Sequence, residues 1–249
     1  MIRVRDLHKS YGGKIAVAGL SFTVEPGQVL GLVGPNGAGK TTTLQVLSGI
    51  LPGAHEELSI GGFHVIRQPI QAKRLLAFVP DEPMLFDLLT VWEHLRYIAA
   101  AYDVRNYEPK GEALLEQFEL ADLRNTLTSE LSRGMKQRLS LCCAYLHDPK
   151  AILLDEPLTG IDPRGIRTAK DTLKEHAANG AAIILSSHLL DIVEDVCTHL
   201  LILQEGQSVF FGSLDEARDK YKSFDGEASL EEAFLRATAD NAVPPQGTR

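Results

Sequence analysis

Apolar residues gather in short unbroken runs at several places in this sequence. The runs are residues 29–33, 151–154, 181–185 and 200–203. Short continuous runs of this kind are typical of strands buried on both faces of a parallel sheet. The stretches between the last three runs, residues 163–178 and 189–196, have helical patterns. The alternation therefore predicts an α/β fold built on a mostly parallel sheet.

The N-terminal part has a different pattern, in which short strands follow one another without helices. Strands are expected at residues 3–7, 16–20 and 21–24, with a turn at Gly12-Gly13. A further hairpin is expected over residues 58–65. The sequence therefore predicts an N-terminal antiparallel β subdomain beside the parallel sheet.

From about residue 83 to residue 146 the apolar residues recur at helical spacing. Helices are expected at residues 90–102, where Thr90 is a suitable N-cap, at 112–118 and at 136–145. Because strand-like runs resume at residue 151, this segment is interpreted as a helical subdomain inserted into the sheet core. The expected parts are a core (residues 1–80 and 147–212), a helical subdomain (82–146), a C-terminal extension (213–236, with helices at 214–220 and 230–236) and a disordered polar tail (237–249).

Charge and cysteine content narrow the possible environments and partners. The chain has 25 Lys and Arg against 33 Asp and Glu, a net charge of −8, and no basic run, so no nucleic-acid partner is expected. Three cysteines without a CxxC pair suit a reducing compartment, although a thiol switch is left open. No signal peptide and no apolar run of about 20 residues are recognised. A cytosolic protein is therefore expected, with any membrane role exerted through a partner.

A glycine-rich loop stands between the predicted strand at 29–33 and a predicted helix at 40–48. It fits the P-loop pattern, GxxxxGK followed by Ser or Thr, and comprises Gly34, Pro35, Asn36, Gly37, Ala38, Gly39, Lys40 and Thr41. Glycines let backbone N–H groups cradle phosphate oxygens, and the helix N-terminus adds its dipole. In such loops the lysine, here Lys40, reaches the β- and γ-phosphates, while the Thr41 hydroxyl binds Mg²⁺ and Thr42 can reach the α-phosphate. ATP and Mg²⁺ are therefore the expected ligands.

Two acidic residues, Asp155 and Glu156, end the apolar run at 151–154. Asp155 is placed to hold Mg²⁺, directly or through water, and Glu156 to act as the general base toward an attacking water. A pair of acids after a strand is also typical of a helix cap or a solvated loop. The presence of a P-loop upstream favours the catalytic interpretation.

Together these motifs resemble those of the ABC ATPase family, and the resemblance covers nearly the whole chain. Walker A is residues 34–41 and Walker B is residues 151–156. The remaining motifs resemble the LSGGQ signature (Leu131, Ser132, Arg133, Gly134 and Met135), the D-loop with Asp162, the switch loop with His188 and the adenine-stacking aromatic Tyr11. The resemblance implies a RecA-like P-loop NTPase core that hydrolyses ATP.

The same resemblance implies a head-to-tail dimer with two ATP molecules between the subunits. Each ATP would lie between the P-loop of one subunit and the signature motif of the other. Ser132 and Gly134 stand where a helix is expected to begin, near Met135, so that a helix N-terminus can face the γ-phosphate. His188 would contact the γ-phosphate and keep Glu156 aligned with the attacking water.

This sequence departs from the family pattern at three positions. Asp81 stands where the Q-loop glutamine is usual, and its carboxylate can still reach Mg²⁺ or the attacking water. A solvated acidic turn is the alternative. Arg133 replaces the first signature glycine and could pair with phosphate or with a partner carboxylate, or extend into solvent. Met135 replaces the signature glutamine. These departures, and the segment 229–235, resemble the ATPase subunits of ABC-2-type exporters.

An exporter subunit of this kind is expected to lie at the inner face of the cell membrane, bound to a separate transmembrane permease. Residues 84–92 are unusually apolar, and those that are exposed would form the groove for that partner. The alternatives are a non-transport ABC ATPase that acts on cytosolic partners and a nucleotide sensor with weak hydrolysis. Neither the cargo nor the choice between a homodimer and a heterodimer follows from the sequence.

Overall fold

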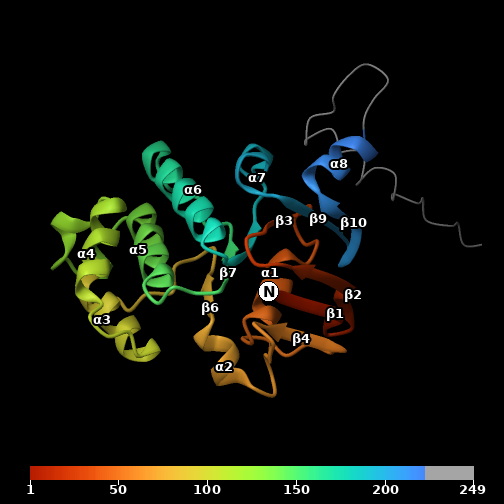
Figure 1. The fold of residues 1–249 in the computed structure, drawn as a ribbon, viewed down its shortest axis with the longest axis horizontal. Helices are drawn as coiled ribbons and strands as arrows, with labels where there is room; N and C mark the ends of the chain where they lie inside the picture. Colours follow the sequence, from red (N-terminus) through yellow and green to blue (C-terminus); the bar gives the residue numbers. More distant parts are fainter. Residues whose placement is uncertain (222–249) are drawn as a thin grey trace, which may run out of the picture.

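A six-stranded sheet forms the centre of the protein in the computed structural model, which describes residues 1–221 (Figure 1). The strand order is β10-β9-β3-β8-β7-β6, and every neighbouring pair is parallel except β9 and β10. The strands are β3 (Val29–Val33), β6 (Leu76–Val79), β7 (Ala151–Asp155), β8 (Ala182–Ser186), β9 (His199–Gln204) and β10 (Gln207–Ser213). The predicted mostly parallel core is confirmed, whereas β6 and β10 were not predicted as strands.

Alternating residues of this sheet enter two different hydrophobic clusters. In β3, Leu30 and Leu32 belong to the cluster that contains the N-terminal strands, while Val29 and Val33 belong to the cluster that contains the helical subdomain. Because successive side chains of a strand point to opposite faces, a sheet covered on both faces needs apolar residues at every position. This requirement explains the unbroken apolar runs in the sequence.

The antiparallel sheet beside this core has the strand order β2-β1-β4-β5. Its strands are β1 (Ile2–Tyr11), β2 (Lys14–Val24), β4 (Glu57–Ile60) and β5 (Phe63–His64). The strands expected at 16–20 and 21–24 are in fact one strand, β2. Register shifts between β1 and β2 allow the hairpin to continue through the irregular positions without interruption. The predicted turn is confirmed, since Tyr11 pairs with Lys14 across Gly12 and Gly13.

The helical subdomain consists of α3 (Val91–Tyr102), α4 (Glu108–Gln117), α5 (Arg133–Tyr145) and the 3₁₀ turns Ala121–Leu123 and Thr128–Glu130. It lies at one end of the molecule, opposite the N-terminal strands (Figure 1). Thr90 caps α3, as the sequence predicted, and the structure adds a reciprocal capping box with Glu93. Helix α4 begins one turn earlier than expected, with Pro109 in its first turn, where the missing N–H of proline costs nothing.

The remaining helices pack around the large sheet. They are α1 (Lys40–Leu47), α2 (Pro69–Arg74), α6 (Pro163–Ala178), α7 (Leu190–Val196) and α8 (Leu214–Lys220). Buried residues of α3, α4 and α5 share one cluster with β6, β7 and α6, so the helical subdomain is fused to the core. No helix within residues 1–221 is long and apolar enough to span a bilayer. The expected helix at 230–236 and tail at 237–249 lie outside the described residues.

Replacing a buried and an exposed leucine in and beside α3 with alanine should change the free energy of unfolding by different amounts. Leu95 is fully buried, so Leu95→Ala should lower the free energy of unfolding by about 2–5 kcal/mol. Leu88 is 84% exposed, so Leu88→Ala should change it by less than about 0.5 kcal/mol. Urea unfolding followed by circular dichroism measures both, and equal losses would contradict the packing described here.

Candidate nucleotide site

The P-loop connects β3 to α1 and packs tightly against β2. Gly39 has φ of 103°, and a Cβ atom there would lie 2.4 Å from the carbonyl oxygen of Ala16. Only glycine fits this conformation and this close approach. The Thr43 hydroxyl donates to the Gly39 carbonyl at 2.8 Å and holds the loop to the first turn of α1. The strand–loop–helix context expected for the motif is therefore present.

Lys40 lies inside this loop and is only 8% exposed. Its ammonium group donates to the carbonyl oxygens of Gly34 at 2.7 Å and Pro35 at 3.3 Å. Burial lowers the pKa of Lys40, and the nearby carboxylates of Glu156 and Asp155 oppose that shift. The loop thus presents a positive charge, a ring of glycines and a helix N-terminus, a combination that suits a polyphosphate.

The Walker B carboxylate is held by the neighbouring strand. Asp155 ends β7, is 2% exposed and accepts a hydrogen bond from the Ser186 hydroxyl at 2.6 Å. The Ser186 hydroxyl oxygen in turn accepts from the Glu156 backbone N–H at 3.1 Å. Asp155 and Ser186 are direct partners in the parallel pairing of β7 with β8. Ser186 was not singled out from the sequence, because its importance depends on this register.

Glu156 and His188 come together as predicted. The His188 Nδ1 atom lies 2.8 Å from Glu156 Oε2, and the His188 backbone N–H donates to the same oxygen at 3.3 Å. Glu156 has φ of 47°, a left-handed conformation that is uncommon for a residue with a side chain. Such conformations gather at functional sites, where the surrounding structure imposes them.

The signature motif stands at the start of α5 and contacts the D-loop. Ser132 is the N-cap and accepts from the Met135 backbone N–H at 3.3 Å, so α5 begins at Arg133, earlier than expected. A Cβ atom on Gly134 would lie 2.5 Å from the Gly160 carbonyl oxygen. The second glycine of the motif is therefore required by the close packing of these two loops. Leu131, the first residue of the motif, is buried.

Asp162 of the D-loop joins three elements. It caps α6 by accepting from the Gly165 backbone N–H at 2.8 Å, and it pairs with the side chain of Arg138. Arg138, from α5, also donates to Glu119 at 3.1 Å. The hydrogen bond from the Gly165 N–H, and after it the one from Arg138, lowers the pKa of Asp162. One buried arginine thus connects the signature helix, the D-loop and the end of α4.

Residues 17–159 match the family model described as "ABC transporter". The chain belongs to the ABC transporter family. EcsA of Bacillus subtilis, an ABC-type transporter ATP-binding protein, is 31% identical over 97% of this chain and 98% of its own length. The Nod factor export ATP-binding protein I of Burkholderia pseudomallei is 36% identical over 85% of this chain and 70% of its own. A solved ATP-binding subunit of an ABC transporter superposes with a TM-score of 0.90 at 33% identity and covers 95% of this chain and 99% of its own.

Two of the positions at which this ABC protein departs from the family pattern contact each other. Arg133 Nη2 lies 3.3 Å from Asp81 Oδ1, and both side chains are about half exposed. The sequence left the partner of Arg133 open between phosphate, a carboxylate and solvent. In this structure the partner is a carboxylate of the same chain.

Tyr11 lies at the tip of the β1–β2 hairpin and is 46% exposed. The hairpin tip is tied to the nucleotide loop through Ala16, whose carbonyl oxygen faces Gly39. The Lys9 ammonium group lies 4.9 Å from the centre of the Tyr11 ring. The exposed Tyr11 ring is available to stack on a base. Its stacking on adenine stays a prediction.

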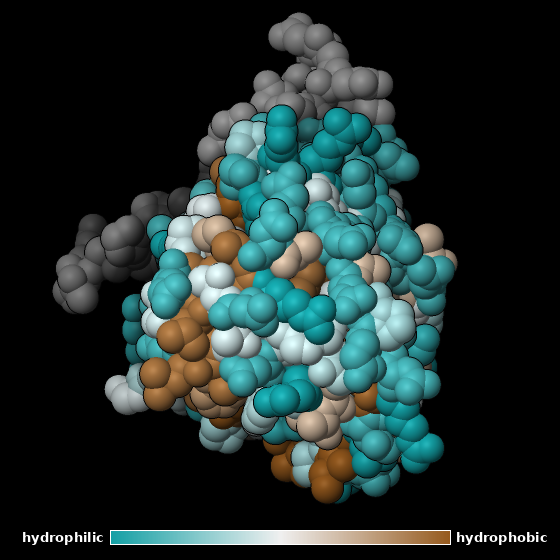
Figure 2. Space-filling view, turned by 90° about the vertical axis from the view of Figure 1, so that its left-hand side faces the viewer, coloured by the Kyte–Doolittle hydropathy of each residue, from teal (hydrophilic) through white to brown (hydrophobic). Residues whose placement is uncertain are grey.

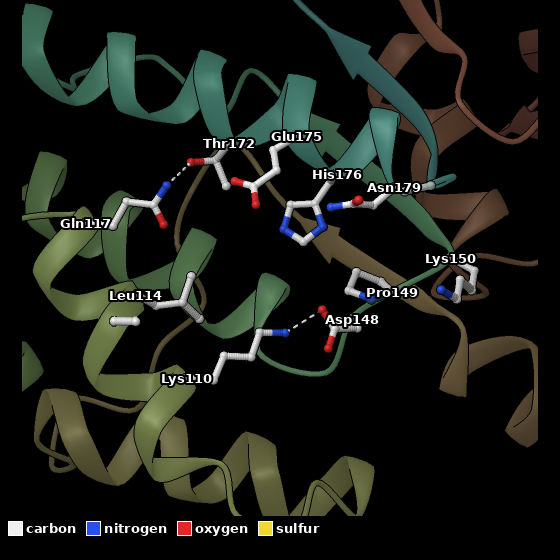
Figure 3. A pocket seen from close by; sticks show the side chains of 12 residues that line it. Lys110, Leu114, Gln117, Asp148, Pro149, Lys150, Thr172, Glu175, His176 and Asn179 are labelled. Carbon is white, nitrogen blue, oxygen red and sulfur yellow. Dashed lines mark hydrogen bonds and ion pairs between the residues drawn. The ribbon is translucent and has the colours of Figure 1, made fainter.

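A separate hollow of about 220 Å³ lies between α4 and α6 (Figure 3). Lys110 and Gln117 of α4 reach across it, to Asp148 at 2.6 Å and to the Thr172 hydroxyl at 2.9 Å. The hollow thus lies between the helical subdomain and the core, and these two polar contacts bridge it. None of the predicted nucleotide-site residues lines it.

The three cysteines are unsuited to a thiol switch. Cys142, Cys143 and Cys197 are all buried and unpaired. Burial raises the pKa of the Cys143 thiol to about 12, so its reactive thiolate is scarce at neutral pH. Packing therefore accounts for these residues.

Replacing Ser186 tests how much its hydrogen bond to Asp155 contributes to catalysis. Ser186→Ala leaves Asp155 without its hydroxyl donor, and we expect a fall in kcat of about tenfold, the lower range for loss of a supporting hydrogen bond at a site. Ser208→Ala on β10 removes a hydroxyl that donates to the backbone carbonyl of Phe210, its one hydrogen-bond partner within residues 1–221, and it should leave kcat unchanged. Steady-state phosphate release measures both, and an unimpaired Ser186→Ala protein would contradict the assigned role.

Proposed function

We propose that this chain is the ATP-hydrolysing subunit of an ABC exporter, working as a dimer on a separate membrane permease. The observation that carries the proposal is the Glu156–His188 pair, anchored at the end of β7 and β8 and within electrostatic reach of the buried P-loop lysine. A general base, its orienting partner and a phosphate cradle are the components that ATP hydrolysis requires.

The residues present fit Mg²⁺–ATP. Thr41 and Asp155 offer the hydroxyl and carboxylate oxygens that this hard cation prefers. Within residues 1–221 no group of three or more His, Cys, Asp and Glu could hold a metal, which agrees with a Mg²⁺ ion that takes only one or two protein ligands and completes its shell with phosphate and water. When bound, the ion neutralises charge on the β- and γ-phosphates.

Each protein group then has a distinct task. The P-loop N–H groups and Lys40 bind and orient the phosphates. Glu156 accepts the proton of the attacking water, and His188 holds the carboxylate in place through its Nδ1 atom and its backbone N–H. Ser186 orients the Asp155 carboxylate by donating a hydrogen bond to it.

A dimer would complete the site with the signature motif of the second subunit. Helix α5 begins at this motif, has no acidic residue in its first turn and therefore presents an unneutralised positive dipole end. Such an end is favourable toward a γ-phosphate. The P-loop of one subunit and α5 of the other would together enclose each ATP.

A hollow of about 240 Å³ near the start of α3 is suited to the permease. Its lining is mostly apolar and includes Met84, Phe86 and Tyr97, which are 83%, 53% and 50% exposed. The His94 Nε2 atom accepts the Phe86 backbone N–H at 2.9 Å, which fixes the loop before α3. Hydrophobic side chains also emerge in patches on the largely hydrophilic surface of this end of the molecule (Figure 2). Exposed apolar groups on a fixed loop are typical of a partner surface.

Export, rather than import, is supported by similarity. The Burkholderia relative is named for Nod factor export, and a further Bacillus subtilis relative, 33% identical, is a linearmycin resistance ATP-binding protein. Asp81, Arg133 and Met135 follow the pattern noted for ABC-2-type exporters. The protein would then lie at the inner face of the membrane, held there by its permease.

ATP hydrolysis can be tested with two substitutions, one that impairs catalysis and one that impairs nucleotide binding. Glu156→Gln should lower kcat by at least about a hundredfold while retaining ATP affinity, because only the proton acceptor is lost. Lys40→Ala should lose nucleotide affinity as well, because the phosphates lose their charge partner. Phosphate release and the binding of a fluorescent ATP analogue measure the two effects. An unchanged residual rate in Glu156→Gln would favour a nucleotide sensor.

The permease can be sought with the same Glu156→Gln protein, which should remain closed around ATP. Tagged protein with Mg²⁺–ATP should recover a polytopic membrane protein from detergent-solubilised native membranes, identified by mass spectrometry. Phe86→Ala should lose that partner and keep nucleotide binding. Ile70→Ala, which removes a 68% exposed apolar side chain on α2, is the matched control. Recovery of soluble partners alone would instead favour a non-transport ABC ATPase.

A further inference from the structure

The pair formed by Arg133 and Asp81 crosses from the core to the signature motif. Asp81 follows the end of β6, at the point where the chain leaves the core for the helical subdomain. Arg133 is the first residue of α5 and lies between Ser132 and Gly134 in the signature motif. Their side chains lie 3.3 Å apart, and both stand at positions where the family has an uncharged residue.

Two further contacts restrict the Arg133 side chain and the helix that carries it. A Cβ atom placed on Gly160 of the D-loop would lie 3.6 Å from Arg133 Cδ, so the arginine stem runs along this loop. Three residues further along α5, Lys136 Nζ lies 3.8 Å from Asp87 Oδ1. The segment 81–87 is therefore tied twice to the first turn of the signature helix.

The charges explain why the two departures occur together. The signature motif is expected to face the ATP of the partner subunit, and an unpaired carboxylate near a triphosphate is unfavourable. An unpaired arginine in the motif would be free to adopt several conformations beside the helix N-terminus. The ion pair neutralises both charges locally and favours one conformation of the Arg133 side chain.

We propose that Asp81 and Arg133 act as one charge-paired positioning element, which sets the signature motif in place for ATP-driven dimer closure. The inference rests on the proposed function. Asp81 serves here as the partner of Arg133 and not as a ligand of Mg²⁺. Neither residue takes part in the reaction itself. Each acts through the position of Ser132 and Gly134.

The expected effect is moderate, because both side chains are about half exposed and water screens their attraction. Exposed ion pairs stabilise a structure by up to about 1 kcal/mol, which corresponds to about fivefold in an equilibrium constant. The coupling between the two residues should therefore change the dimerisation constant by about three- to fivefold at low salt. It should decrease at high ionic strength.

A double-mutant cycle in the Glu156→Gln background tests the proposal, with ATP-driven dimerisation measured by analytical ultracentrifugation. Asp81→Asn and Arg133→Gln should each weaken dimerisation, and the double variant should be no weaker than the weaker single variant. The reversed pair, Asp81→Arg with Arg133→Asp, should recover part of the loss. Binding of a fluorescent ATP analogue to the monomer should stay unchanged in every variant, a result that separates positioning from a damaged P-loop.

Glu112→Gln is the matched control. Glu112 is a half-exposed carboxylate that pairs with Arg124 at 2.9 Å within the helical subdomain, away from the signature motif. Its replacement should leave dimerisation and ATP affinity unchanged. An equal loss in this control would show that any ion pair of the subdomain matters, and it would overturn the specific role of Asp81 and Arg133.

Two further outcomes would contradict the inference. Additive losses in the cycle would mean that the residues act independently. In variants that keep Glu156, a shifted Mg²⁺ dependence of kcat in Asp81→Asn but not in Arg133→Gln would instead assign Asp81 to the metal. Failure of the proposed function is distinct from both, because the parent Glu156→Gln protein would then show no ATP-dependent dimer at all.

Discussion

The parallel pairing of β7 with β8 is the constraint on which the chemistry of this protein depends. It sets Asp155 opposite Ser186 at the carboxyl ends of two buried strands. Glu156 follows β7 directly and His188 stands two residues after β8, and the pairing brings His188 Nδ1 to within 2.8 Å of Glu156 Oε2. A slip of one residue would turn every side chain of a strand to the other face. Both faces of the sheet belong to closely packed apolar clusters, so a slip would force side chains of different shape into filled space.

The sheet has a second task, which is to position the phosphate loop. β3 pairs with β8 on one side and with β9 on the other. The P-loop that follows β3 therefore emerges at the same edge as Asp155 and His188. This is the edge at which open α/β sheets bind their ligands. The antiparallel hairpin packs against the P-loop, because the carbonyl oxygen of Ala16 in β2 lies close to Gly39.

The helical subdomain is linked to the nucleotide site by ion pairs, and in the proposed function it would transmit changes at the nucleotide. Arg138 links its signature helix to the D-loop through Asp162, and the Asp81–Arg133 pair links the same helix to the end of β6. The exposed apolar loop before α3 begins at Met84, three residues after Asp81. A change at the nucleotide can thus reach the proposed permease surface through a few charged contacts. The two bridges across the hollow between α4 and α6 support the subdomain on its other side.

The sequence by itself determined much of this description, because its signals are local. Unbroken apolar runs indicated the buried strands, the GxxxxGK loop and the two acids after residue 154 indicated the nucleotide site, and Thr90 marked the start of α3. The continuity of β2 and the strand β10 were missed, because their residues alternate irregularly and sheet pairing stabilises them. β6 was also missed, although its four apolar residues carry the same local signal as the other buried strands. Only the tertiary structure decided the role of Ser186 and the partner of Arg133. Both depend on contacts between residues 31 and 52 positions apart, and no local pattern records which distant side chain a polar group will meet.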